Sequence, residues 1–180
     1  GQRLFFGLMP IRKQKDTSLV DFETAKLDIW HYNDDYLQPQ QLGQLPKELQ
    51  RSYHAVLNGD DTRVVQLGAE DTDSLFLADK GNMPYVLVIT TKGARVEAQW
   101  QGFAAQTAWI ISTKDGSEKL VKQKQRAVFT MSPKGRYVIW YDLKAKNYFT
   151  YTVNTGTVTN ITKTIKVPLY NEEDDHPDDP

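Results

Sequence analysis

The chain contains no cysteine, which excludes disulfide bonds and thiol chemistry. It also lacks long apolar runs: none approaches the roughly 20 apolar residues that a membrane-spanning helix needs. The first ten residues lack the basic region and the length of a signal peptide. The 22 Lys and Arg residues are balanced by 23 Asp and Glu residues, so no basic surplus is available to neutralise nucleic-acid phosphates. We therefore expect a soluble globular chain with no membrane span and no nucleic-acid partner.

Helix signals are equally scarce. One segment, residues 46–52, combines a proline suited to a first helical turn with residues that favour helix. Elsewhere the pattern is one of short apolar stretches separated by tight turns, which predicts β-strands. The expected strands cover residues 3–8, 26–32, 53–57, 63–67, 74–78, 85–90, 108–112, 118–122, 127–131, 137–141, 148–153 and 157–162.

Three turns rich in Asn, Asp and Gly, at residues 58–61, 114–117 and 154–156, each join two predicted strands as a hairpin. Gly116 and Gly156 are 40 residues apart, whereas Gly59 and Gly116 are 57 apart. The excess in the second spacing is assigned to an insertion around residues 91–105. A period of about 40–45 residues with four strands per unit is typical of β-propeller blades.

These spacings predict an all-β fold made of antiparallel four-stranded blades of a partial β-propeller. About three blades are expected, at residues 3–67, 74–122 and 127–163, within one domain that covers residues 1–170. Residues 171–180 are expected to form an acidic tail or an inter-blade loop. Because closed propellers have about 4–8 blades, the ring stays open, and its uncovered blade faces favour self-association.

Two groups of residues have types that support chemistry. His31 with Asp34 and Asp35, together with Ser52 and His54, supplies the components of a Ser-His-Asp arrangement. Histidines often lie near some carboxylate by chance, and nothing here indicates an oxyanion hole. We therefore expect no catalytic residue in these 180 residues.

The second group lies in the acidic tail, where oxygen and imidazole groups that suit a divalent cation occur close together. It comprises Asp174, Asp175, His176, Asp178 and Asp179. We favour a solvated turn or disordered end, since two prolines and like charges oppose a compact arrangement. Neither a metal nor a cofactor is therefore expected.

Most aromatic residues on the predicted strands are interpreted as filling the space between blades. They are Trp109, Tyr137, Trp140, Tyr141, Tyr148, Phe149 and Tyr151. Trp100 is the one candidate ligand contact, because it lies in the less regular insertion 92–105. Asp28 and Trp30 are assigned a structural role, with the carboxylate holding a turn while the indole packs between sheets.

Three segments resemble the N-terminal β-propeller region of bacterial prolyl oligopeptidase family serine peptidases, of the Bacteroidetes type. They are KLDIWHYNDDYLQPQQL at 26–42, SPKGRYVIWYDLKAKNYFTYTVNTG at 132–156, and VPLYNEEDDHP at 167–177. The most specific parts are LDIWHYNDDYLQPQQ and the Trp-Tyr-Asp of residues 140–142. The resemblance extends over most of the chain.

The resemblance implies a propeller that gates or docks peptide substrate for an α/β-hydrolase domain of the parent chain. It also implies export to the periplasm or the cell surface. No G-x-S-x-G nucleophile elbow occurs in these residues, so no catalytic residue is carried over, and this chain is expected not to be an enzyme by itself. The alternative is a stand-alone β-rich module that binds a protein or another ligand.

Overall fold

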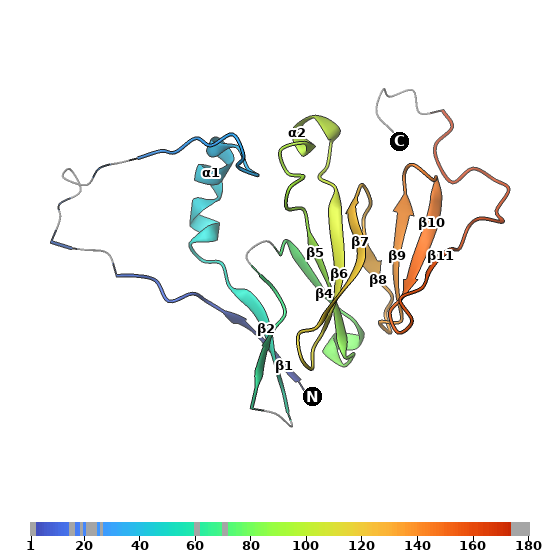
Figure 1. The fold of residues 1–180 in the computed structure, drawn as a ribbon, viewed down its shortest axis with the longest axis horizontal. Helices are drawn as coiled ribbons and strands as arrows, with labels where there is room; N and C mark the ends of the chain where they lie inside the picture. Colours follow the sequence, from blue (N-terminus) through green and yellow to red (C-terminus); the bar gives the residue numbers. More distant parts are fainter. Residues whose placement is uncertain are drawn as a thin grey trace.

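A computed structural model gives the fold and describes residues 3–14, 17, 18, 20, 25, 27–59, 62–69 and 72–173. Three antiparallel sheets lie side by side in an arc, in the order of the chain (Figure 1). The ring that they begin is not closed. The predicted fold class, an all-β partial propeller, is therefore confirmed.

The sheets follow one another along the chain. The first has the order β1-β2-β3, and the other two each have four strands, in the orders β4-β5-β6-β7 and β11-β10-β9-β8. The strands of the first sheet are β1 (Arg3–Leu8), β2 (Tyr53–Asn58) and β3 (Val64–Gln66). Those of the second are β4 (Ser74–Leu77), β5 (Tyr85–Thr90), β6 (Gln106–Ser112) and β7 (Glu118–Gln125). Those of the third are β8 (Thr130–Met131), β9 (Tyr137–Asp142), β10 (Asn147–Thr152) and β11 (Val158–Asn160).

The core lies in two layers between the sheets. Between the first and second sheets, Val56 and Val65 pack with Val86, Val88 and Ile111. A larger cluster lies between the second and third sheets and contains Leu87, Ile89, Ala108, Ile110, Val121, Ala127, Phe129, Val138, Trp140, Tyr151 and Val153. Strand β5 is a continuous apolar run because its alternate side chains enter the two different layers.

The two ends of the sheets differ in character. One end, which we call the turn rim, carries the connections β2–β3, β4–β5, β6–β7, β8–β9 and β10–β11. Here hydrogen bonds join neighbouring sheets: the amide of Asp79 donates to the carbonyl of Pro133 at 2.8 Å, and the Arg3 guanidinium donates to the carbonyl of Asn82 at 2.6 Å. The opposite end, the helix rim, carries the connections β1–β2, β3–β4, β5–β6, β7–β8 and β9–β10.

The helix rim contains α1 (Gln38–Glu48) in the β1–β2 connection and α2 (Ala98–Gln101) in the β5–β6 connection. The prediction of a helix at 46–52 was wrong in its bounds. Pro39 occupies the first turn, where its missing N–H needs no partner, and the Gln40 side chain accepts a hydrogen bond from the Leu37 amide at 3.2 Å. Pro46 lies inside the helix near its end. Helix α2 was not predicted, and no helix of the described ranges is long and apolar enough to cross a membrane.

The predicted strand at 26–32 was also wrong. Lys26 lies outside the described residues, and residues 27–32 form no strand. Strand β1 instead pairs directly with β2, which leaves this segment without a neighbouring strand. As a result Trp30 is 71% exposed and does not pack between sheets. The predicted strand at 127–131 shortens to Thr130–Met131, because Ala127 and Phe129 enter the core from a connection.

Candidate functional site

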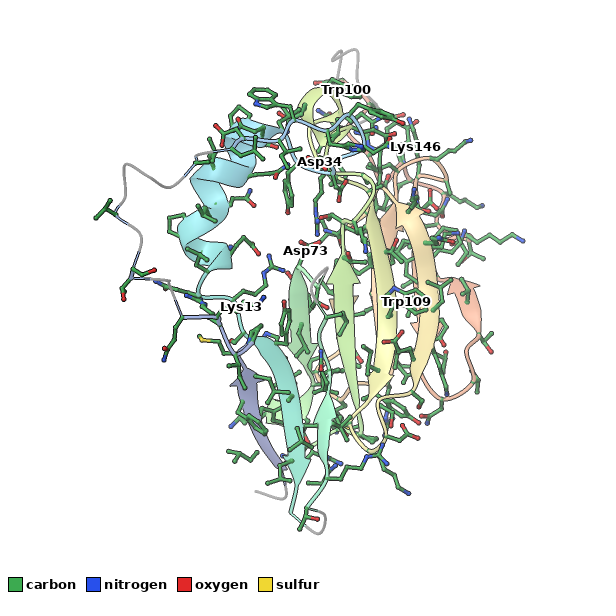
Figure 2. All side chains as sticks on the ribbon, turned by 60° about the vertical axis from the view of Figure 1, so that its left-hand side comes forward. Lys13, Asp34, Asp73, Trp100, Trp109 and Lys146 are labelled. Carbon is green, nitrogen blue, oxygen red and sulfur yellow. The ribbon has the colours of Figure 1, made fainter. Side chains whose placement is uncertain are left out.

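A cleft lined by both polar and apolar surface lies on the helix rim, between α1 and the adjoining ends of the first two sheets. It consists of two adjacent cavities of ≈ 530 and ≈ 560 Å³. The cavities share the lining residues Tyr36, Gln44, Glu48, Arg51 and Ala69. We call the combined cavity the α1 cleft. In Figure 2, Asp73 lies at the sheet end that faces α1, and Asp34 lies nearer the far end of the helix.

Three separate segments build the walls of the α1 cleft. Helix α1 contributes Gln44, Lys47 and Glu48 from one side of its C-terminal half. The chain around the start of β2 contributes Ser52 and His54. The β3–β4 connection completes the cleft with residues that include Gly68, Ala69, Thr72 and Asp73.

Arg95 joins the chain before α1 to the β3–β4 connection. Its guanidinium lies 3.2 Å from a carboxylate oxygen of Asp35 and 2.9 Å from one of Asp73. Its Nε also donates to the hydroxyl of Thr91 at 3.0 Å. The Arg95 side chain is only 12% exposed, so these interactions are partly shielded from water and are stronger than those of a surface pair.

The carboxylates of Asp35 and Asp73 also accept hydrogen bonds from other groups. Asp73 accepts hydrogen bonds from the amide and the hydroxyl of Thr91, and Asp35 accepts one from the amide of Gly93 at 2.9 Å. Every carboxylate oxygen of the network that is described here therefore has a donor. The network is a rigid frame for the cleft and leaves little capacity for binding a ligand itself.

Tyr36 lines the cleft beside this frame. The guanidinium of Arg95 is 4.6 Å from the centroid of the Tyr36 ring, a cation–π contact. Burial raises the pKa of the Tyr36 hydroxyl above its ordinary value, although the charge of Arg95 opposes this effect. The phenol therefore stays neutral and can donate a hydrogen bond at neutral pH.

Arg51 and Glu48 form an ion pair at the mouth of the α1 cleft. The hydrogen bond that the Arg51 guanidinium donates to the Glu48 carboxylate raises the pKa of Arg51, so this side chain remains charged. By contrast, the side chains of Gln44, Lys47 and His54 make no hydrogen bond within the part of the chain that the structure describes. These three groups are available to a ligand.

The predicted Ser-His-Asp components are not brought together. Ser52 and His54 line the α1 cleft, whereas His31 and Asp34 line a different cavity. His31 accepts a hydrogen bond from the amide of Asn33 at 3.2 Å, and Asp34 accepts one from the Gln41 side chain at 3.1 Å. Asp35 is occupied by Arg95. The contacts of His31, Asp34 and Asp35 therefore hold the loop before α1 in place.

Trp100 lies on α2 and is 64% exposed. It is not among the residues that line the α1 cleft, and its role as a ligand contact stays a prediction. Of the other aromatic residues, Trp140, Phe149 and Tyr151 pack between sheets as interpreted. Tyr137 and Tyr148 are instead largely exposed.

The acidic cluster of residues 174–179 lies outside the described residues. Within the described ranges, no three His, Asp or Glu side chains are grouped closely enough to hold a metal ion. The sequence reasoning missed Arg51, Asp73 and Arg95. They lie in irregular connections, where no periodicity or fixed spacing marks a residue that joins distant segments.

No family model matches the chain, and no curated protein matches it. Among solved structures, it is similar to a candidate 6-phosphogluconolactonase from Bacteroides fragilis, with 17% sequence identity and a TM-score of 0.31. That match covers 64% of this chain and 33% of the other, so the chain spans about a third of the length of that protein. Likeness at this level is no evidence of a shared activity.

Proposed function

We propose that this chain is a non-catalytic β-propeller segment of a prolyl oligopeptidase-like serine peptidase. In this role it docks and gates peptide substrate for a hydrolase domain that lies outside these residues. The observation that carries the proposal is the α1 cleft, an opening with polar and apolar lining on one rim of an arc of blade-like sheets. The segment with the most specific resemblance to the peptidase family, residues 27–41, supplies Asp35, Tyr36 and Gln41 to the lining of that cleft.

The chemistry of the α1 cleft suits a peptide backbone. A peptide presents alternating carbonyl acceptors and amide donors, and the Gln44 amide can both donate and accept. Lys47 can donate to carbonyl groups or to a terminal carboxylate, and His54 adds an imidazole to the lining of the same cavity. The volumes of the two cavities fall in the range of about 300–1,000 Å³ that is usual for ligand pockets.

Rigidity is the second property that favours docking. Because the Arg95 frame already holds the cleft wall, a bound peptide need not order it, and less free energy is lost on binding. The carboxylates of the frame are satisfied and do not compete for the ligand. We therefore assign peptide binding to the side chains of Gln44, Lys47 and His54, and the Arg95 frame positions them.

Binding without cleavage follows from the same site. Ser52 and His54 line one cavity of the α1 cleft together with two carboxylates, but Asp73 is bound by Arg95 and Glu48 is paired with Arg51. A serine nucleophile needs a base that is itself oriented by a third group, together with an oxyanion hole. The cleft therefore lacks the relay that would activate Ser52.

The test is a titration of the ¹⁵N-labelled chain with a short peptide of alternating alanine and proline, followed by amide chemical shifts. We expect shifts at the α1 cleft, and we expect Lys47→Ala and His54→Ala each to weaken binding at least fivefold. Lys114→Ala, an exposed lysine on the turn rim, is the matched control and should leave binding unchanged. Absence of binding, or binding that ignores both cleft variants, would overturn the docking role.

Two further measurements separate docking from its alternatives. Incubation of the same peptide with the chain should give no hydrolysis, and cleavage that Ser52→Ala abolishes would show an enzyme instead. Reading the gene beyond the codon for Pro180 tests the parent hydrolase directly. A G-x-S-x-G elbow there supports the peptidase role, whereas a stop codon together with peptide binding would indicate a stand-alone binding module.

A further inference from the structure

The charged residues that line the α1 cleft include more cations than carboxylates. Three carboxylates line it, and each already contacts a guanidinium: Asp35, Glu48 and Asp73. The four cations are Lys47, Arg51, Lys92 and Arg95. Four positive charges against three negative ones leave a surplus of one positive charge, which attracts an anionic group. The electrostatics of the cleft therefore favour a ligand that carries a negative charge.

The ammonium group of Lys47 has no counter-ion among the described residues. Lys47 lies in the last turn of α1, where backbone carbonyls carry a partial negative charge. The carbonyls of Lys47 and Glu48 already accept hydrogen bonds, at 3.0 and 3.1 Å, from the amides three residues further along the chain. These carbonyls therefore do not need the ammonium as a cap, and Lys47 is available to a ligand.

Two further donors lie in the same cavity as Lys47. The backbone position of His54 is fixed, because its carbonyl accepts hydrogen bonds from the amides of Leu67 at 2.7 Å and Gly68 at 3.1 Å. Its imidazole can supply an N–H, and the neutral hydroxyl of Tyr36 supplies an O–H. Because the carboxylates of the cleft are already occupied, the unused polar groups around Lys47 are mainly donors. They suit an anion that is rich in acceptor oxygens.

From the charge surplus and these donors we propose that the α1 cleft binds peptides by their C-terminal carboxylate, with Lys47 as its ion-pair partner. This role rests on the proposed docking function and names the class of peptide that is docked, one with a free C-terminus. A terminal carboxyl has an ordinary pKa of about 3.3–3.7 and is ionised at neutral pH. Hydrogen bonds between charged groups are about twice as strong as neutral ones, so this carboxylate outweighs any single backbone carbonyl of the peptide.

The spacing of Gln44 and Lys47 favours a carboxylate on the main chain over one on a side chain. Residues three apart on a helix are neighbours, with Cβ atoms about 5–6 Å apart, and one residue of extended chain spans about 3.3–3.6 Å. A main-chain carboxylate at the ammonium of Lys47 therefore brings the last one or two peptide groups level with the amide of Gln44. A side-chain carboxylate would hold the peptide backbone further away, because its methylene groups intervene.

The first test uses two N-acetylated peptides of alternating alanine and proline that differ only at the C-terminus, a carboxylate in one and a carboxamide in the other. Calorimetric titration of the wild-type chain at pH 7 should show at least fivefold tighter binding of the carboxylate peptide. Added salt should reduce this ratio, because it screens the ion pair. Equal affinities would overturn the role of the carboxylate and leave the docking function intact, whereas failure of both peptides to bind would overturn both.

Lys47→Met removes the charge and keeps an apolar stem. We expect it to lower the affinity for the carboxylate peptide to that for the carboxamide peptide, whose own affinity should change less than twofold. Lys47→Arg should keep the preference, since it keeps the charge. Lys114→Met on the turn rim is the matched control and should alter neither affinity. Equal weakening of both peptides by Lys47→Met would indicate a structural role for this residue and contradict the assignment.

Glu48→Gln tests the same ion pair in the opposite direction. It removes a carboxylate next to Lys47 and releases the Arg51 guanidinium from its pair with Glu48. The carboxylate peptide should therefore bind at least twofold more tightly, with no change for the carboxamide peptide.

A third peptide, a carboxamide with one internal glutamate, identifies which carboxylate is recognised. If it bound as tightly as the peptide with a free C-terminus, the assignment to the C-terminus would be wrong. Circular dichroism checks that each variant is folded. If one is not, the comparison of the three peptides on the wild-type chain decides the outcome by itself.

Discussion

Arg95 and Asp73 are joined by an ion pair with a nitrogen–oxygen distance of 2.9 Å, although they belong to different connections of the helix rim. Asp73 immediately precedes β4, and Arg95 follows β5. Through Asp35, the same guanidinium also holds the segment that leads into α1. One side chain therefore determines how the α1 cleft is attached to the sheets.

Replacing Arg95 by Leu should lower the free energy of unfolding by about 1–3 kcal/mol, because two partly buried carboxylates lose their charged partner. Denaturant unfolding followed by fluorescence measures the change. Arg136→Leu, at an exposed arginine of the turn rim, should change it by less than about 0.5 kcal/mol. Equal effects of the two substitutions would show that Arg95 is not a structural anchor.

The core between the second and third sheets should be sensitive to lost volume. Phe129 is fully buried, with its ring centroid 5.4 Å from that of Trp140, so Phe129→Ala should destabilise the chain by about 3–5 kcal/mol. Its neighbour Val128 points to solvent, and Val128→Ala should have almost no effect. Thermal unfolding of the two variants provides the comparison, and a small effect at Phe129 would argue against this packing.

Two glycines should respond to alanine in opposite directions. Gly135 has φ +62°, and an added Cβ would lie 3.0 Å from the Cβ of Ala78, so Gly135→Ala should cost about 1–3 kcal/mol of stability. Gly43 lies inside α1 with no atom near its added Cβ. There, alanine should stabilise by about 0.5–1 kcal/mol through helix propensity. Chemical denaturation of both variants decides the signs.

Acid should destabilise the turn that contains Asp115, because the pKa of this carboxyl is lowered in the folded chain. Hydrogen bonds from the amide of Ser117 and from nearby serine hydroxyls lower the pKa of this carboxyl from 3.8 to about 2. Because the folded pKa lies below the unfolded one, this stabilisation is present above about pH 4 and is lost as the pH falls toward 2. Carbon NMR of the Asp115 carboxyl measures the pKa, and Asp115→Asn should remove this part of the pH dependence. A titration midpoint near the ordinary value would contradict the prediction.

The β-hairpins could be predicted because their signals are local. Gly116 and Gly156 were placed in turns from their neighbours alone, and both have positive φ, +76° and +72°. A tight turn of this kind needs a residue without a Cβ, whatever the rest of the chain does. The paired strands β6–β7 and β10–β11 follow from these turns.

The helix rim could not be predicted in the same way. Pro46 was read as a helix start, but Pro39 takes that position, because either proline satisfies the local rule for a first turn. The segment around Trp30 has the composition of a buried strand. It is exposed because β1 already pairs with β2, a contact between residues about 50 positions apart.

The amino-acid sequence by itself determined the class of the fold, the positions of its Gly turns and the division of its strands among three sheets. These follow from short-range backbone sterics and from the alternation of side chains along a strand. Only the tertiary structure decided that Arg95, Asp73 and Asp35 meet and that α1 encloses a cleft. Such contacts join residues far apart in the chain, and their free energy depends on the burial and geometry that the packed sheets create.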